Sequence, residues 1–385
     1  MGFSGCQAQC RLSKRHRQTQ PDTHHGGGCA DGAVVRLRFD LARELGCGLD
    51  VVRASNRYLI FPIFIIVFFF LEVAYFKIAN HFNIIDKPNQ RSSHTQITLR
   101  GGGIIFPIAL VAGVFIYQFA QIYLALGVLA IATISFLDDI LTLNNKLRIG
   151  VHLISVLLLL FQVATNQNLI DSTFFNLVSC LLILASIVII IGIINAYNFM
   201  DGINGITVLY SLSTIISIWF LQNSKGYNLL TSEVWMLIVA SLLVFAFFNL
   251  RKKAKTFAGD VGSISMALLI CFLVLSLILL TKDLRYLLLL GIYGLDAVAT
   301  IFCRIIRKEN IFEAHRSHFY QFLANEKKIN HILVSIFYSL VQLVLNLIII
   351  YSSLNYVLGA FFLIAVGYAI LRLYLEGRHK LFTNY

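Results

Sequence analysis

Charge is scarce in this sequence. Only 13% of its 385 residues are Asp, Glu, Lys or Arg, whereas 58% are hydrophobic and the mean hydropathy is +0.78. A soluble domain rarely exceeds about half apolar residues. The composition therefore excludes an ordinary soluble protein and predicts an all-α, polytopic integral membrane protein. The net charge of +12 does not indicate nucleic-acid binding, because Lys and Arg collect in loops on one side of a bilayer.

Two other features are missing. No apolar segment follows the first Met, which argues against a secretory signal peptide. The seven Cys define no disulfide framework, and the Cys and His within residues 6–29 fit no zinc-ligand spacing. Cys180, Cys271 and Cys303 lie in apolar runs, so we expect them to be small core residues.

Composition changes near residue 57. Residues 1–57 are rich in Arg, Gly, His and Cys and lack long apolar runs, whereas Ile, Leu, Phe and Asn dominate afterwards. We expect residues 1–57 to be a disordered extension or a misassigned start. Residues 58–375 are predicted to form the membrane domain, and residues 376–385 a cytoplasmic tail.

Eleven apolar runs follow that are long enough to cross about 30 Å of hydrocarbon. As a single helix the uncharged stretch 104–137 would be about 50 Å long, so two spans with a turn near Tyr117–Gln121 are predicted. The same argument splits 331–373 at Ser352–Asn355. The predicted spans are 58–80, 102–118, 120–137, 149–165, 175–197, 205–221, 234–250, 264–281, 286–303, 331–351 and 356–373.

Lys and Arg gather in the loops after the odd-numbered spans and in the C-terminal tail. Loops after the even-numbered spans are short and nearly uncharged. By the positive-inside rule the odd loops are cytoplasmic, which places the N-terminus outside; the many Arg of residues 1–57 oppose that placement. Each unusual polar motif lies in an odd loop, so we expect one site facing the cytoplasm.

The first two motifs pair basic and acidic groups. The segment Asp86–Gly103 reads DKPNQRSSHTQITLRGGG, and a basic, glycine-rich stretch before a helix suits phosphate binding. It could also be an ordinary basic juxtamembrane loop. Asp138 and Asp139 end the third span, where a metal or a cationic group would relieve their repulsion; otherwise they protrude into water.

The next two motifs combine carboxylates with amides and Gly. The stretch NAYNFMDGING places Asn195, Asn198 and Asp201 on one helical face, which suggests a site for a phosphate, a metal or both. Asp260 lies in FAGDVGS before the eighth span. It is either a metal ligand or a helix cap.

The last motif, HRSHFYQ, holds His315, Arg316 and His318. Zinc would normally need a third protein ligand, so phosphate recognition by Arg and His is preferred. Oxygen-only ligands in the other loops suit Mg²⁺ completed by substrate phosphates, with Mn²⁺ as the alternative. Glu72 and Asp296 lie within spans and are functional candidates by default. We place both outside the core site, and Glu72 could pair with Lys77.

The ordered motifs DKPNQRSSH, LDD, NAYNFMDGING, FAGDVGS and HRSHFYQ resemble those of the polyprenyl-phosphate N-acetylhexosamine-1-phosphate transferases. The resemblance covers about residues 58–375. It implies an enzyme of the bacterial inner membrane that uses a UDP-sugar and undecaprenyl phosphate. The products would be a lipid diphosphosugar and UMP, at the first membrane step of O-antigen or other surface polysaccharide synthesis. A homodimer is compatible with this.

The resemblance also implies roles. Asp260 resembles the magnesium-binding Asp and Asn198 the Asn that assists it, while Asp138 and Asp139 match paired catalytic acids near the lipid phosphate. The residues expected to bind the two substrates are Lys87, Arg91, His94, Lys146, Asn195, Asp201, Asn204, His315, Arg316 and His318.

Three alternatives stay open. HRSH departs from the run of His in the phospho-N-acetylmuramoyl-pentapeptide transferases, which favours a simpler N-acetylhexosamine and resembles the O-antigen-initiating branch. A secondary transporter would gather its charges near the midplane, often with inverted repeats. A non-catalytic lipid-phosphate-binding protein would not need all five motifs.

Removal of residues 1–57 should leave the membrane domain folded, because the apolar runs and every motif lie beyond them. Size-exclusion profiles and thermal unfolding in detergent would compare the truncated and full-length proteins. Aggregation of the truncated protein would contradict the prediction.

Overall fold

The computed structural model describes residues 60–86, 97–141, 143–169, 176–310 and 316–383. The chain divides into two units, Met1–Tyr58 and Leu59–Tyr385, and every described residue belongs to the second. The predicted extension lies outside the described residues, as do Lys87, Arg91, His94 and His315. The domain boundaries stay predictions.

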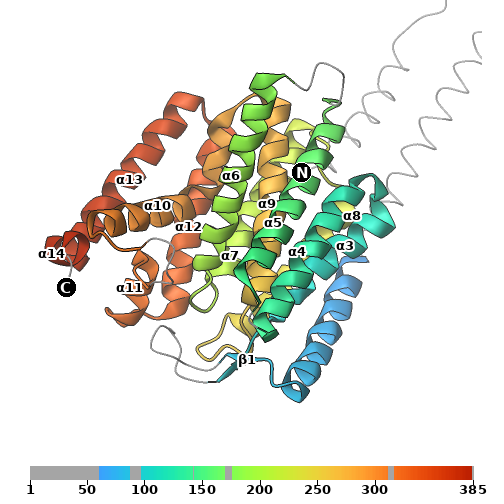
Figure 1. The fold of residues 1–385 in the computed structure, drawn as a ribbon, viewed down its shortest axis with the longest axis horizontal. Coiled ribbons are helices and arrows are strands. Elements are labelled where there is room, and N and C mark those ends of the chain that lie inside the picture. The colour runs from blue at the N-terminus through green and yellow to red at the C-terminus, as the bar shows by residue number, and fades with distance from the viewer. Residues whose placement is uncertain (1–59, 87–96, 142, 170–175, 311–315, 384–385) are drawn as a thin grey trace, which may run out of the picture. The chain divides into compact units, whose positions relative to one another are not determined.

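The all-α prediction is confirmed. Among the described residues, ten helices are long and apolar enough to cross a membrane, and the shorter Gly102–Tyr117 is also apolar. These helices coincide one for one with the predicted runs (Figure 1). They are Ile60–His81, α3 (Ile105–Tyr117, after the 3-10 turn Gly102–Ile104), α4 (Ile122–Leu141), α5 (Asn145–Asn166), α6 (Leu177–Phe199), α7 (Ile206–Lys225), α8 (Ser232–Asn249), α9 (Gly259–Thr281), α10 (Gly291–Ile306, after the 3-10 segment Leu284–Leu290), α12 (His331–Tyr351) and α13 (Leu354–Glu376).

The remaining elements are short. Strands β1 (Ile85–Asp86) and β2 (Thr98–Leu99) pair antiparallel, α11 spans Phe319–Asn325 and α14 spans Arg378–Phe382. In Figure 1, β1 and α11 lie toward the same end of the helix bundle.

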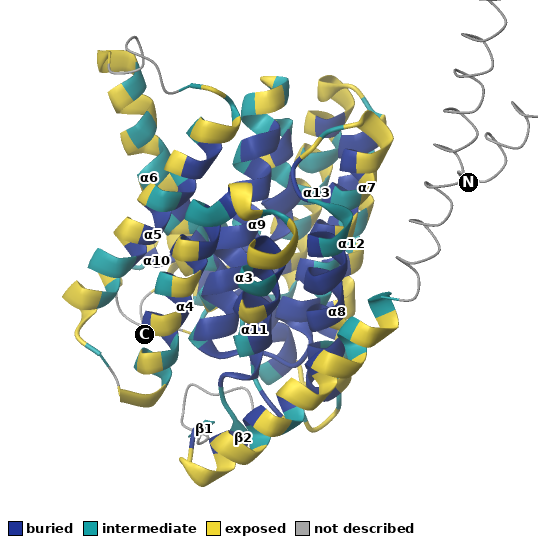
Figure 2. Ribbon diagram, turned by 90° about the vertical axis from the view of Figure 1, so that its right-hand side faces the viewer, coloured by how far each residue is buried: buried dark blue, intermediate teal, exposed yellow. Residues whose placement is uncertain are grey.

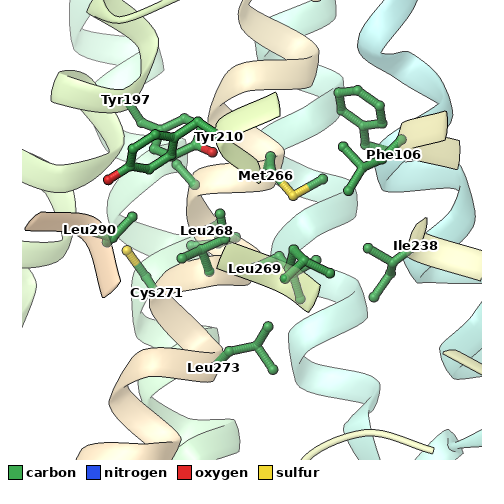
Figure 3. Packing of buried hydrophobic residues seen from close by; sticks show 14 of the residues in the cluster. Phe106, Tyr197, Tyr210, Ile238, Met266, Leu268, Leu269, Cys271, Leu273 and Leu290 are labelled. Atoms are coloured by element: carbon green, nitrogen blue, oxygen red, sulfur yellow. The ribbon is translucent and has the colours of Figure 1, made fainter. Parts of the chain in front are cut away.

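Helix α9 is the centre of the fold. It is apolar on all sides, as expected for a helix buried by its neighbours, and it contacts α3, α4, α5, α6 and α7. In Figure 3 its Met266 and Leu269 point toward Phe106 of α3 and Ile238 of α8. Figure 2 shows the buried residues concentrated around α9.

Helices α6 and α13 are peripheral. Only 11% and 6% of the residues in their apolar windows are buried, so most of their residues are exposed or half-buried. This placement corrects one expectation, because Cys180 on α6 is exposed, whereas Cys271 and Cys303 are buried as predicted.

The end of the first loop is joined to the segment before α9 by the backbone. The Phe257 N–H donates to the Leu99 carbonyl at 2.9 Å, and the Gly102 and Gly103 N–H groups donate to the Phe257 and Ala258 carbonyls at 2.9 and 3.1 Å. A parallel bridge pairs Leu99 with Thr256. Two loops that are far apart in sequence therefore form one structural unit.

The glycine run allows this close approach. A Cβ at Gly103 would lie 2.5 Å from the Gly262 Cα and 2.8 Å from the Ala258 carbonyl oxygen. Gly101 and Gly259 have φ of 82° and 69°, a region that favours Gly. The sequence suggested that this run exposes N–H groups to phosphate. In the structure the N–H groups of Gly102 and Gly103 donate to backbone carbonyls of the segment that precedes α9.

Glu72 is fully buried in the helix Ile60–His81. Its Oε1 lies 2.6 Å from the position of a Cβ on Gly102, and Thr256 contacts the same point. Neither carboxylate oxygen has a hydrogen-bond partner within the described part of the chain, so the alternative of pairing with Lys77 is wrong.

The substitution Gly103→Ala should lower the free energy of unfolding by about 1–3 kcal/mol, because the new methyl group meets backbone atoms that cannot rotate away. Gly150→Ala on α5 is the control, since nothing lies within 4 Å of its added Cβ. Thermal unfolding in one detergent would compare both variants with the wild type. Equal midpoints for both variants would contradict the prediction.

Candidate functional site

Arg100 is the cation that joins two acidic motifs. Its Nε lies 2.8 Å from Asp139 Oδ1 and its Nη2 lies 3.3 Å from Asp260 Oδ1. Burial alone would lower the pKa of Arg100, but the charges of Asp139 and Asp260 reverse this and hold the pKa above its ordinary value. The Tyr75 hydroxyl donates to the Arg100 carbonyl oxygen at 2.5 Å and fixes the backbone beneath the guanidinium.

A second arginine approaches from α5. Arg148 Nη1 lies 2.7 Å from Asp138 Oδ2, and its Nη2 lies 3.6 Å from Asp260 Oδ2. The Asn144 side chain accepts from the Lys146 N–H at 2.9 Å and caps α5. In this register Arg148 faces the carboxylates, whereas the side chain of Lys146, the predicted lipid-phosphate ligand, is exposed.

Asp138 and Asp139 have different environments. The Asp139 side chain is 0% exposed, and besides Arg100 it accepts from the Asp260 and Val261 N–H groups at 3.3 and 3.4 Å. It therefore caps the first turn of α9, where a negative charge is stabilised. Asp138 is 11% exposed and also accepts from the Leu143 N–H at 2.7 Å. Of the two, only Asp138 is open to a ligand.

Asp260 lies in the first turn of α9, and Asn198, at the end of α6, contacts the same part of α9. The Ser263 hydroxyl donates to Asn198 Oδ1 at 2.6 Å, which ties the end of α6 to α9. No group of three His, Cys, Asp or Glu side chains that could hold a metal occurs among the described residues. The donors present are oxygens, and Asp260 is 15% exposed with its arginine contacts at 3.3 and 3.6 Å. This set fits Mg²⁺ only when substrate phosphates complete the coordination.

The stretch from Asn195 to Gly205 is held by contacts with neighbouring segments of the chain. The Thr207 hydroxyl donates to Asp201 Oδ1 at 2.5 Å, and burial raises the pKa of Asp201 to about 6. The Asn204 amide donates to the Arg251 carbonyl at 2.9 Å, which ties this predicted substrate ligand to the loop after α8. The Asn195 amide donates to the Ile191 carbonyl of its own helix at 3.0 Å.

The last motif contacts that stretch through Tyr320. Its hydroxyl donates to the Phe199 carbonyl at 2.7 Å, and a Cβ on Gly202 would collide with the same hydroxyl. Burial raises the pKa of Tyr320 well above its ordinary range, so the phenol stays neutral and remains a donor. The fifth motif is thereby joined to the third.

His318 and Arg316 line different cavities. His318 lines a groove of about 470 Å³ together with Arg148, His152 and Asn195, and the other walls are mostly apolar side chains of α5, α6 and α10. Arg316 lines a separate hollow of about 510 Å³ near α14. Described residues from all five motifs therefore converge, whereas Arg316 lines a different hollow and Lys146 is exposed.

Four residues that contribute to this geometry were absent from the predicted site. Arg100 and Arg148 contact the carboxylates, Asp296 contacts His318, and Tyr320 holds the third motif. Arg100 stands directly before the glycine run and Tyr320 lies inside HRSHFYQ, so the position of each residue in the sequence marked it as a candidate. Nothing in the sequence indicated that Arg148, and not Lys146, contacts the carboxylates.

These features define a multi-pass membrane protein whose polar motifs meet beside a largely apolar groove. Comparison with known proteins agrees. The model of glycosyl transferase family 4 matches residues 121–278, which contain the second, third and fourth motifs. Over this stretch the chain is similar to glycosyl transferase family 4.

Individual relatives have related names. The chain is 28% identical over 256 residues to a probable undecaprenyl-phosphate N-acetylglucosaminyl 1-phosphate transferase of Bacillus subtilis, covering 63% of this chain and 70% of the relative. It is 30% identical over 174 residues to the phospho-N-acetylmuramoyl-pentapeptide-transferase of Thermotoga neapolitana, covering 43% and 56%. For the protein of that name from Clostridium beijerinckii, the values are 29% over 234 residues, with 56% and 69% covered.

Asp139→Asn should lower the free energy of unfolding by about 1–3 kcal/mol, because the amide group faces backbone donors at the start of α9 and no longer balances Arg100. Asp138→Asn is the matched control, since the Asp138 side chain is 11% exposed whereas that of Asp139 is 0% exposed. Thermal unfolding without substrate measures both. A larger loss for Asp138→Asn would contradict this assignment.

Proposed function

We propose that the protein transfers N-acetylhexosamine 1-phosphate from a UDP-sugar to undecaprenyl phosphate. One observation carries the proposal: Arg148, which contacts Asp138 and Asp260, also lines the largely apolar groove. A lipid phosphate needs such a pair of environments, with cations for its head and apolar walls for its tail. The name of the Bacillus subtilis relative and the five ordered motifs support the same reaction.

The reaction joins two anions, so charge neutralisation and positioning are the main tasks. An oxygen of the lipid phosphate attacks the β-phosphorus of the UDP-sugar. The new P–O bond forms while the bridging P–O bond breaks, and UMP leaves with the bridging oxygen. Arg100 and Arg148, already beside Asp260, are placed to neutralise the diphosphate.

Asp260 and Asn198 would hold Mg²⁺, which supplies positive charge to the phosphate oxygens when bound. Without it the two arginines balance the Asp260 carboxylate. We assign Asp138 to the lipid phosphate, while Asp139 positions α9. Since a phosphomonoester loses its second proton near pH 6, a general base has little to contribute, and positioning by Asp138 dominates.

The donor and its orientation complete the proposal. The site faces the cytoplasm, where nucleotide sugars are made, and Asp201 lies toward the nucleotide. His318 contacts the diphosphate or the sugar from the groove. The expected roles of Lys87, Arg91, His94 and His315 stay part of the proposal. The membrane is the bacterial inner membrane, and the lipid product starts O-antigen or another surface polysaccharide.

A second candidate is transfer of phospho-N-acetylmuramoyl-pentapeptide, which the names of several relatives favour. The HRSH sequence, with Arg316 and Ser317 where that branch carries His, favours a simpler sugar.

A purified sample in detergent with Mg²⁺, undecaprenyl phosphate and a panel of UDP-sugars tests the function. UMP release that requires both lipid and metal supports it, and the panel distinguishes the two candidates. A folded sample that releases no UMP with any donor would falsify the proposal.

Arg148→Ala should lower kcat by about 100-fold or more, as expected for removal of a charged group that stabilises the transition state. Lys146→Ala is the matched control two residues away, and its exposed side chain predicts a change below about threefold. Initial rates of UMP release measure both. A larger effect of Lys146→Ala would show that Lys146, not Arg148, binds the lipid phosphate.

Asp260→Ala should abolish turnover at every Mg²⁺ or Mn²⁺ concentration, because the proposed metal loses its carboxylate ligand. A metal titration of UMP release measures this, with Asp283→Ala on a distant loop as the control. Turnover by Asp260→Ala that still depends on metal would move the metal elsewhere.

A further inference from the structure

Asp296 is a buried carboxylate that the proposed reaction does not use. It lies on α10 with an exposure of 0%, and within the described part of the chain the groups that hydrogen-bond to it are donors. The Tyr338 hydroxyl donates to Oδ2 at 2.6 Å, and the Thr300 hydroxyl donates to Oδ1 at 3.2 Å. A buried carboxylate with this many donors is a fixed acceptor.

The remaining donors to Asp296 come from the last motif. His318 Nδ1 lies 3.1 Å from Oδ1, and the Phe319 and Tyr320 N–H groups donate to Oδ1 and Oδ2 at 3.2 and 3.3 Å. Three consecutive residues are thereby bound to one side chain. The imidazole is held in the form that carries hydrogen on Nδ1, because the carboxylate can only accept.

Arg372 holds the same segment from the other side. Its Nη2 donates to the Ser317 carbonyl at 2.7 Å, and its Nη1 donates to the Thr300 hydroxyl at 3.0 Å. Since Thr300 also donates to Asp296, the two charged groups are joined through one hydroxyl. Residues Ser317–Tyr320 therefore have fixed positions on both sides.

We propose that Asp296 is a positioning residue that aims the His318 imidazole into the groove shared with Arg148 and Asn195, by fixing hydrogen on Nδ1 and holding the backbone that follows. Nδ1 faces Asp296, and His318 is one of the residues that line the groove. The kinetic consequence rests on the proposed function; the hydrogen position does not.

Nitrogen-15 NMR of histidine-labelled protein in detergent tests the hydrogen position without activity. His318→Gln identifies the His318 signals. In the wild type Nδ1 should show the shift and one-bond coupling of a nitrogen that bears hydrogen. An Nδ1 without hydrogen in the folded wild type overturns the proposal, and this measurement needs no variant of Asp296.

A double-mutant cycle tests the aim of the ring. Asp296→Asn should lower kcat/KM for UMP release by about 10- to 100-fold, as for other partners that orient a functional imidazole. In a His318→Ala background the same substitution should change kcat/KM by less than about threefold, because the residue through which it acts is gone. Equal losses in both backgrounds would show a merely structural role and overturn the proposal.

Tyr338→Phe is the matched control, because it removes one donor to Asp296 and does not contact His318 through a hydrogen bond. It should lower the unfolding midpoint but leave kcat/KM within about threefold. A loss as large as that of Asp296→Asn would overturn the proposal. If the wild type released no UMP, the proposed function would fail, and the NMR result would still decide the position of the hydrogen.

Discussion

The ion pair between Arg100 and Asp139 is the contact on which the site depends. It links the first loop to the end of α4 at 2.8 Å, and the same guanidinium reaches Asp260. The backbone pairing of Leu99 with Thr256 places Arg100 there, and the Gly103–Gly262 approach keeps both segments in contact. If this guanidinium were absent, two carboxylates would face each other across the start of α9 without a cation between them.

The protein uses one device twice. Asp139 caps the first turn of α9, and Asp296 caps the first turn of α11, each from a different helix. A cap supplied by the residue directly before a helix fixes only that helix. A cap supplied from another helix also fixes the distance between the two helices. Both devices act directly beside a polar motif, Asp260 in one case and His318 in the other. The motifs are therefore positioned by buried acids that need not touch a substrate.

Helix positions and the meeting of the motifs were readable from the sequence, because apolar length and loop charge are local properties. The roles of individual side chains were not. Whether Lys146 or Arg148 faces the carboxylates depends on where Asn144 caps α5. Whether Asp139 binds a ligand or caps a helix depends on the tertiary position of α9. A run of glycines is expected in an open phosphate-binding loop and also where two backbone segments pack closely, so the sequence did not distinguish these two possibilities.

Asp296 also has a consequence for biosynthesis. Its helix is made before the residues that neutralise it: His318 follows 22 positions later, Tyr338 42 positions later, and Arg372, on the helix α13, later still. An unpaired Asp near the centre of a helix costs about 3 kcal/mol on insertion. The helix Leu284–Ile306 therefore enters the membrane against a penalty that only later segments of the chain remove, from the last motif onward.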